Sequence, residues 1–221
     1  NVLLLGLGQP ASSDFTVSGN AASASAQGNA QTSQVQASGA TLAQTGGSGI
    51  ALGASQSSTA NVGASSTVTM LGVQNDKLVS NGNRVTVSDN SVSAAAAANT
   101  GANAVQLDAD STLTGVGALL SNGQIVNGSN VTATARVPVL GLTNAAASTG
   151  STPTITGNAV QSSALGSQAT NQVAAQAAGA LANTGTSLVN SQQHVAGNTS
   201  ATTNIDRVGS ATPLSTNDTL V

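Results

Sequence analysis

Apolar and polar residues alternate in short runs along the whole chain. Arg84–Ser88 and Asn130–Val137 are two such runs, in which Val, Thr and Ala follow one another at every second position. Gly-Asn, Asn-Gly and Gly-Ser pairs separate the runs. A period of two is typical of a strand with one buried face, and these dipeptides are typical of tight turns. The pattern predicts strands of about four to eight residues.

Two stretches depart from this pattern because they are rich in good helix formers. Ser93–Asn99 contains a run of alanines, and Ala164–Asn183 combines Ala with Gln, Val and Leu. Both align with Ala21–Ala40, in which Ser, Gly and Asn are too frequent for a stable helix. We therefore expect strands in all three stretches.

The chain also matches itself at a long period. Thr16–Asn20 recurs as Thr86–Asn90 and again as Thr154–Asn158. A second motif recurs at nearly the same spacing, as Val68–Gly72, Val137–Gly141 and Ile205–Gly209. Two independent motifs thus give one period of about 69 residues, which is the signature of a repeat architecture.

The N-terminal run Val2–Gly6 is a fourth copy of the second motif, with Gly6 matching Gly72. The chain therefore begins and ends on the same element. We expect a single repeat domain over residues 1–221, made of an N-terminal segment (1–14) and repeats at about 15–84, 85–153 and 154–221.

Composition narrows the fold and excludes several functions. Charged residues make up 5% of the 221, and the chain has one Phe, no Trp, no Tyr and no Cys. The four cations, Lys77, Arg84, Arg136 and Arg207, are scattered, so nucleic acid is not expected as a partner. No apolar stretch approaches the length of a membrane span.

Side chains this small can fill only a narrow core, which is what a parallel β-solenoid has. We predict an all-β fold of this kind, with three repeats of about 69 residues and three coils of roughly 23 residues in each, giving about nine coils. Asn recurs at two predicted corners, where its side chain can hydrogen-bond from coil to coil and its backbone tolerates positive φ. The predicted turn and ladder positions are Asn20, Asn90, Asn158, Asn61, Asn130 and Asn198.

The sequence offers little that could support catalysis. His194, the only histidine, has no carboxylate near it in sequence. Asp108 and Asp110 could meet a Ca²⁺ ion, but a solvated pair is favoured because the equivalent positions in the other repeats carry no acids. We expect no catalytic, cofactor-binding or metal-binding residues, no cofactor, and no enzymatic activity.

Repeated Thr-x-Thr units suggest an ice-binding surface as one alternative function. Thr16, Thr86 and Thr154 align between the repeats, as do Ser18, Ser88 and Thr156. Strand propensity on a solvent-exposed face explains the same pattern and is favoured.

Small and amide residues are spaced within the repeats in a way that resembles bacterial functional amyloids. Ser18-Gly19-Asn20 is followed by Gly28-Asn29, and Gly157-Asn158 by Asn171-Gln172, with Ala and Gln between them. These segments are similar to the repeats of Fap-type biofilm amyloid subunits and, more loosely, of curlins. The resemblance implies a secreted structural subunit that polymerises into an extracellular matrix fibre.

The two ends of the chain independently suggest polymerisation, because a solenoid leaves unpaired backbone at its end strands unless a cap covers it. We expect these ends to stack head-to-tail on further copies of the chain, forming an extracellular or cell-surface filament. An adhesin or passenger-stalk solenoid that binds a surface is the alternative. The predicted polymerisation ends are Val2, Leu3, Leu4, Leu5, Leu7, Leu220 and Val221.

Overall fold

The computed structural model describes residues 2–6, 14–44, 49–75, 84–144, 152–182 and 187–210. Every regular element among them is a β-strand, including the two alanine-rich stretches. The strands are β1 (Val2–Gly6), β2 (Asp14–Ser18), β3 (Ala21–Ala43), β4 (Ile50–Ser58), β5 (Val62–Thr67), β6 (Met70–Asn75), β7 (Arg84–Ser88), β8 (Ser91–Thr114), β9 (Ala118–Val126), β10 (Val131–Asn144), β11 (Thr152–Thr156), β12 (Ala159–Ala177), β13 (Ala180–Ala182), β14 (Ser187–Val195) and β15 (Thr199–Ser210).

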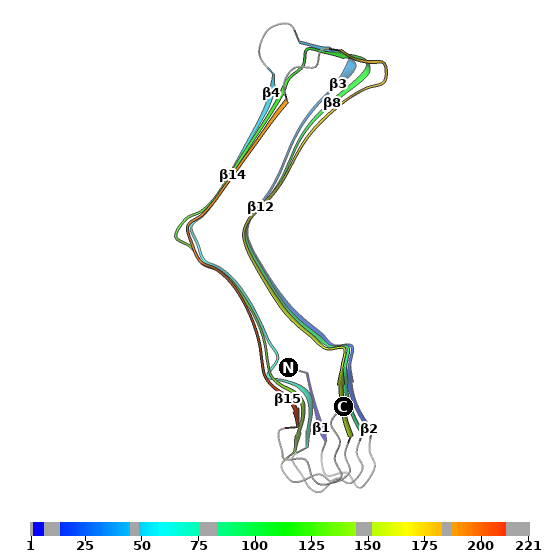
Figure 1. Ribbon diagram of the computed structural model, residues 1–221, viewed down its shortest axis with the longest axis vertical. Coiled ribbons are helices and arrows are strands. Elements are labelled where there is room, and N and C mark those ends of the chain that lie inside the picture. The colour runs from blue at the N-terminus through cyan, green and yellow to red at the C-terminus, as the bar shows by residue number, and fades with distance from the viewer. Residues whose placement is uncertain are drawn as a thin grey trace.

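The chain runs out and back three times, and the three turns lie on top of one another (Figure 1). We call β2–β6 the first turn, β7–β10 the second turn and β11–β15 the third turn. The outgoing strands of each turn end in β3, β8 or β13, and the returning strands start at β4, β9 or β14. All strand pairs among the described residues are parallel, which is consistent with the stacking of a parallel β-solenoid.

Each turn uses about three times as many residues as the predicted coil of roughly 23. Thr86 pairs with Thr16 on one side and with Thr154 on the other, so direct neighbours lie 70 and 68 residues apart in the chain. The prediction of about nine coils is therefore wrong for the described residues. It failed because the Gly and Asn residues inside β3 and β8 bend these strands instead of ending them, so the strands reach 23 and 24 residues.

The N-terminal strand is also paired differently from the sequence match. Val2 pairs with Leu71 and Gly6 with Asn75, whereas the match had placed Gly6 beside Gly72. A short motif rich in leucine leaves the register open, because neighbouring leucines can replace one another along the strand. β1 lies on the edge of β6, on the side opposite β10.

The outgoing and returning strands form two facing sheets that are offset by half a step along the stack. β5 packs on both β3 and β8, and β10 packs on both β8 and β12. Gln56 Nε2 in the first turn accordingly donates to the carbonyl of Thr100 in the second turn, at 2.9 Å. β15 packs on β11 and β12 of its own turn, and its other side has no outgoing strand against it among the described residues.

Two apolar cores lie between the sheets, one on each side of a bend. The first core includes Val87, Val131 and Val137, and the second includes Leu107, Leu113 and Leu120. The bend is visible halfway along the ribbons in Figure 1. In β8, Asn99 Nδ2 donates to the carbonyl of Ile125 on the returning strand, at 2.9 Å. Gly28 of the first turn lies close to Ala98 of the second, so that a Cβ atom on Gly28 would come within 2.6 Å of the carbonyl oxygen of Ala98.

Candidate functional site at the two faces of the stack

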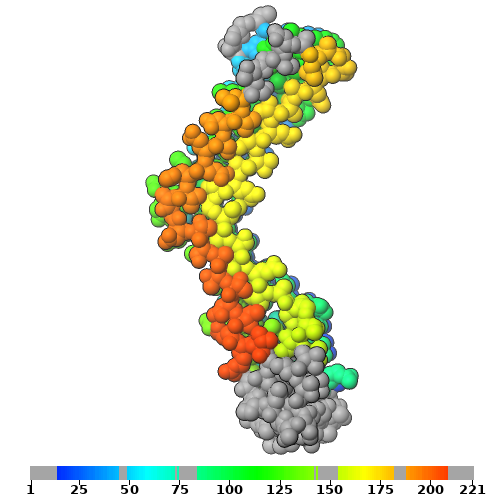
Figure 2. Space-filling view, in the orientation of Figure 1, coloured from blue at the N-terminus to red at the C-terminus, as the bar shows by residue number. Residues whose placement is uncertain are grey.

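The third turn presents apolar side chains to solvent. We call its uncovered side, seen in yellow to red in Figure 2, the third-turn face. Of the nine large apolar side chains that are exposed among the described residues, seven belong to this turn. They are Leu165, Leu181, Leu188, Val189, Val195, Ile205 and Val208.

Many of these residues are paired in register with second-turn residues that are buried. Their exposure therefore results from their place at the end of the stack. Leu113 in the second turn is 0% exposed, whereas Leu181, its partner in the third turn, is 55% exposed. Val189 repeats the contrast with its buried partner Leu120. The third-turn face therefore presents core positions that no further turn covers.

The opposite side, formed by β2–β6, is the first-turn face. A cavity of about 230 Å³ lies beside Leu42 and Ile50 of this turn and is also lined by Val116 of the second turn. A second cavity of about 430 Å³ lies at the bend, between Gly28 and Val62. Leu42, which lines the first of these cavities, is in register with Leu113 and through it with the exposed Leu181 of the third turn.

Asn20, Asn90 and Asn158 lie above one another at one corner and are joined by hydrogen bonds. Asn20 Nδ2 donates to Asn90 Oδ1 at 2.9 Å, and Asn90 Nδ2 donates to Asn158 Oδ1 at 2.8 Å. Backbone amides of Asn20 and Asn90 donate to the same acceptors. These contacts form what we call the Asn ladder.

The backbone of this corner differs in detail from the prediction. Positive φ falls on the residues before the asparagines, namely Gly19, Asp89 and Gly157, and not on the asparagines themselves. Asp89 is the one non-glycine residue with positive φ among the described residues, at 56°. Asp tolerates this conformation better than most residues, because its short polar side chain can hydrogen-bond locally.

The second predicted corner is held more loosely. Asn130 donates its backbone N–H to Asn61 Oδ1 at 2.8 Å, and Asn198 accepts a backbone hydrogen bond from Val131 through its carbonyl, also at 2.8 Å. Asn61 and Asn130 are exposed, as is Asn198.

A second ladder lies inside the molecule and was missed by the sequence reasoning. Gln56, Gln124 and Gln193 are paired in register; Gln124 Nε2 donates to Gln56 Oε1 at 2.7 Å, and Gln193 Nε2 donates to Gln124 Oε1 at 3.2 Å. Gln124 also donates to the carbonyl of Gln168 on the facing sheet, at 2.9 Å. We call this set the Gln ladder. Its signal was in the sequence, because the three glutamines recur with the period of the repeat.

Gly101 makes room for the Gln ladder, since a Cβ atom there would lie 3.0 Å from Gln124 Nε2. Asn122 is also buried, and neither of its amide atoms has a hydrogen-bond partner. Asn103 is paired with Asn171 through Nδ2 at 2.9 Å. A polar layer therefore separates the two apolar cores.

Of the residues considered for catalysis or metal binding, His194 lies in β14, whereas Asp108 and Asp110 lie in β8. His194 is exposed, and so is Asp110. Asp108 Oδ2 accepts hydrogen bonds from Gln36 at 3.1 Å and Gln106 at 2.7 Å. Within the described ranges no three His, Cys, Asp or Glu side chains gather in a way that could hold a metal ion.

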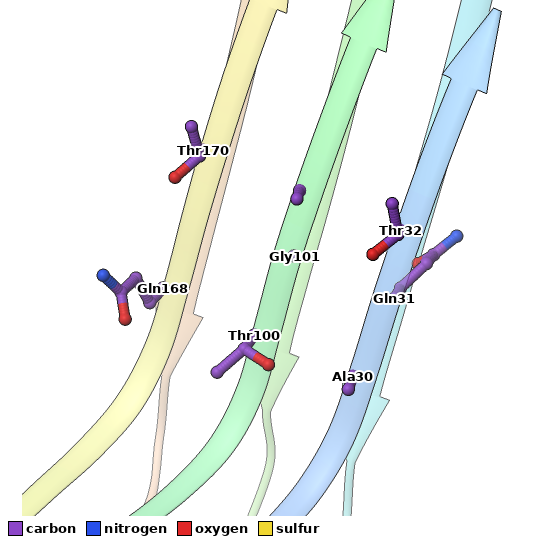
Figure 3. A pocket seen from close by; sticks show the side chains of 8 residues that line it. Ala30, Gln31, Thr32, Thr100, Gly101, Gln168 and Thr170 are labelled. Atoms are coloured by element: carbon purple, nitrogen blue, oxygen red, sulfur yellow. The ribbon is translucent and has the colours of Figure 1, made fainter.

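The outer surface carries neutral polar groups. Thr16, Thr86 and Thr154 lie side by side on three turns. A shallow pocket of about 290 Å³ crosses β3, β8 and β12, where Figure 3 shows Thr32, Thr100 and Thr170 on neighbouring strands. No charged or aromatic side chain lines this pocket.

Of the sequence-predicted polymerisation ends, Val2, Leu3, Leu4 and Leu5 lie in β1 and are paired with β6. Leu7, Leu220 and Val221 lie outside the described residues. Among the side chains that the structure describes, the exposed large apolar ones lie mostly on the third turn, in particular in β14 and β15.

No protein-family model, curated protein or solved structure matches this chain. The described residues also contain no helix with the length and apolar character needed to cross a bilayer.

Proposed function

We propose that the chain is a structural subunit that stacks head-to-tail into an extracellular filament, with the third-turn face of one copy covered by the first-turn face of the next. The observation that carries the proposal is the half-step offset between the two sheets. β14 and β15 pack on β12 on one side only, and their other side, which faces away from the second turn, has no outgoing strand among the described residues; this is the place that β3 of a second copy would take. A heterologous contact of this kind does not close, so it produces a fibre.

The residues that would meet across this contact are alike. We call residues that are paired in register from turn to turn a column. If each column continues into the next copy by one step, Leu181 of one copy lies beside Leu42 of the next, and Ile205 beside Val68. Val189 would meet Leu52 in the same way. Each pair would bury apolar surface worth about 25 cal/mol per Å².

The two ladders would continue across the contact with their direction preserved. Each glutamine in the third and second turns donates to the turn below it, so Gln56 of the next copy would donate its second N–H to Gln193 Oε1. The Asn ladder runs in the opposite sense, so Asn158 Nδ2 of one copy would exchange its present bond to the Thr156 carbonyl for one to Asn20 Oδ1 of the next. This polarity favours head-to-tail over head-to-head stacking.

Charge does not oppose the contact. By the same columns, Asp206 would lie beside Thr69, and Arg207 beside Met70. Asp14 on the first-turn face would lie beside Thr152. No like charges of the described residues would therefore be brought opposite one another.

In this proposal each repeat of about 69 residues supplies one layer of the filament, so one subunit adds three layers. The sparsely charged surface and the continuous ladders of backbone hydrogen bonds suit a durable fibre outside the cell. The resemblance to Fap-type and curlin repeats agrees with a role in a biofilm matrix or a surface fibre.

Two isoleucines of similar exposure provide a matched test. Ile205 is 38% exposed on the third-turn face, and Ile125 is 42% exposed on the outer face of the second turn. We expect Ile205→Lys to prevent filament growth, because its charge would be buried between copies, and Ile125→Lys to leave growth intact. Negative-stain electron microscopy and fibre diffraction, with its strand spacing near ~4.8 Å, report the outcome. Monodisperse particles of the unaltered chain under all native conditions would refute the proposal.

A further inference from the structure

β1 holds a position that the next subunit would need. Its five residues pair with one edge of β6, from Val2 beside Leu71 to Gly6 beside Asn75. On its other edge β6 pairs with β10, so that Leu71 lies beside Leu140. β10 in turn pairs with β15, which places Val208 beside Leu140.

These registers put Val2 and Val208 in one column. If a second copy stacks by continuing that column, Val208–Ser210 of one copy must pair with Leu71–Val73 of the other. In the single chain, Val2–Leu4 already pairs with those residues. One strand edge cannot pair with two strands at once, because each backbone N–H and C=O on that edge is used once.

We propose that β1 is a displaceable cap on the first-turn face, and that a second copy of this chain adds to the filament by replacing β1 with its own β15. This inference rests on the proposed function. The exchange favours the incoming strand because β1 has five residues, whereas β15 has 12 and would extend the same pairing along β5 and β6. Growth is then limited by the release of β1, so the cap keeps single chains apart until it opens.

Proline substitutions in the full chain test this mechanism. Proline lacks the backbone N–H that a strand ladder needs, and adjacent residues of a strand direct their N–H groups to opposite edges. The double variant Leu3→Pro/Leu4→Pro therefore removes an N–H directed at β6 whichever residue supplies it. The double variant Leu3→Val/Leu4→Val keeps both N–H groups and serves as the control.

We expect the proline variant to shorten the lag before filaments appear several-fold, and the valine variant to behave like the unaltered chain. The lag is followed by light scattering, with electron microscopy of the products and circular dichroism to show that each variant keeps its strands. An equal or longer lag for a folded proline variant overturns the inference. Failure of the unaltered chain to form filaments instead refutes the proposed function, so the two failures are distinguishable.

Hydrogen exchange on the unaltered chain gives a second readout that needs no substitution. Amides of Leu3–Leu5 should be more protected in the single chain than in the filament, and amides of Val208–Ser210 should change in the opposite direction. Continued protection of β1 within the filament would overturn the inference.

Discussion

The Gln ladder gives the sharpest test of how this narrow molecule is held together. Gln124 is 0% exposed, and its Nε2 atom donates to Gln56 Oε1 at 2.7 Å and to the carbonyl of Gln168 at 2.9 Å. Gln124→Met keeps an unbranched side chain of similar length but removes both donors. Two acceptors between the sheets are then left without these partners.

Each unpaired buried acceptor costs about 1–3 kcal/mol, and the buried Met side chain recovers about 2 kcal/mol through the hydrophobic effect. We therefore expect a net loss of about 2 kcal/mol in the free energy of unfolding. Urea unfolding followed by circular dichroism, on chains kept below the concentration at which they assemble, measures the difference. The midpoint should fall while the slope with denaturant stays constant.

Gln34→Met is the matched control, because Gln34 is exposed on the outer side of β3. Its effect should stay within about 0.5 kcal/mol. If Gln124→Met proved as stable as Gln34→Met, the hydrogen bonds of the Gln ladder would contribute nothing measurable, and the reasoning from buried acceptors would be refuted.

Three further substitutions can be tested in the same unfolding assay, one expected to raise stability and two expected to lower it. Asn122→Leu should raise stability by about 2 kcal/mol, because the buried amide that it removes has no partner, and a destabilised variant would contradict this. Asn90→Ala should lower stability by about 2–4 kcal/mol, since Asn90 bonds to Asn20, to Asn158 and to the carbonyl of Val17; an unchanged midpoint would show that the Asn ladder is not stabilising. Leu113→Ala should cost about 3 kcal/mol, because it opens a cavity in a fully buried site, and a loss below about 1 kcal/mol would mean that the second core is loosely packed.

The sequence was sufficient to predict strands and their parallel stacking. The motif around Asn20, Asn90 and Asn158 could be read because it combines a glycine or aspartate corner with β-branched neighbours, and its offsets equal the observed pairing distances along the chain. The alanine-rich stretches were assigned as strands for a sound reason, since their alignment with Ala21–Ala40 is an actual strand pairing.

The coil length and the Gln ladder escaped prediction for physical reasons. Gly28 and Gly101 look like strand ends in sequence, but here they are close-approach positions within continuous strands. Glutamine carries no strong strand preference, so the recurrence of Gln56, Gln124 and Gln193 did not stand out from a glutamine-rich background. The half-step offset between the sheets depends on packing between distant segments, and no local pattern encodes it.

The large separation of paired strands along the chain affects how the protein folds. Hydrogen-bonded neighbours are far apart along the chain; Thr86, for example, lies 70 residues from Thr16 and 68 residues from Thr154. Chains dominated by such remote pairings have a high contact order and fold slowly, because loop-closure entropy is lost before any pairing is gained. During synthesis, a first turn would emerge with no layer to pair with until the second had followed. Folding within one chain and pairing with a second chain would then compete for the same unpaired strand edges. Because only the second process involves two molecules, their relative rates would depend on protein concentration.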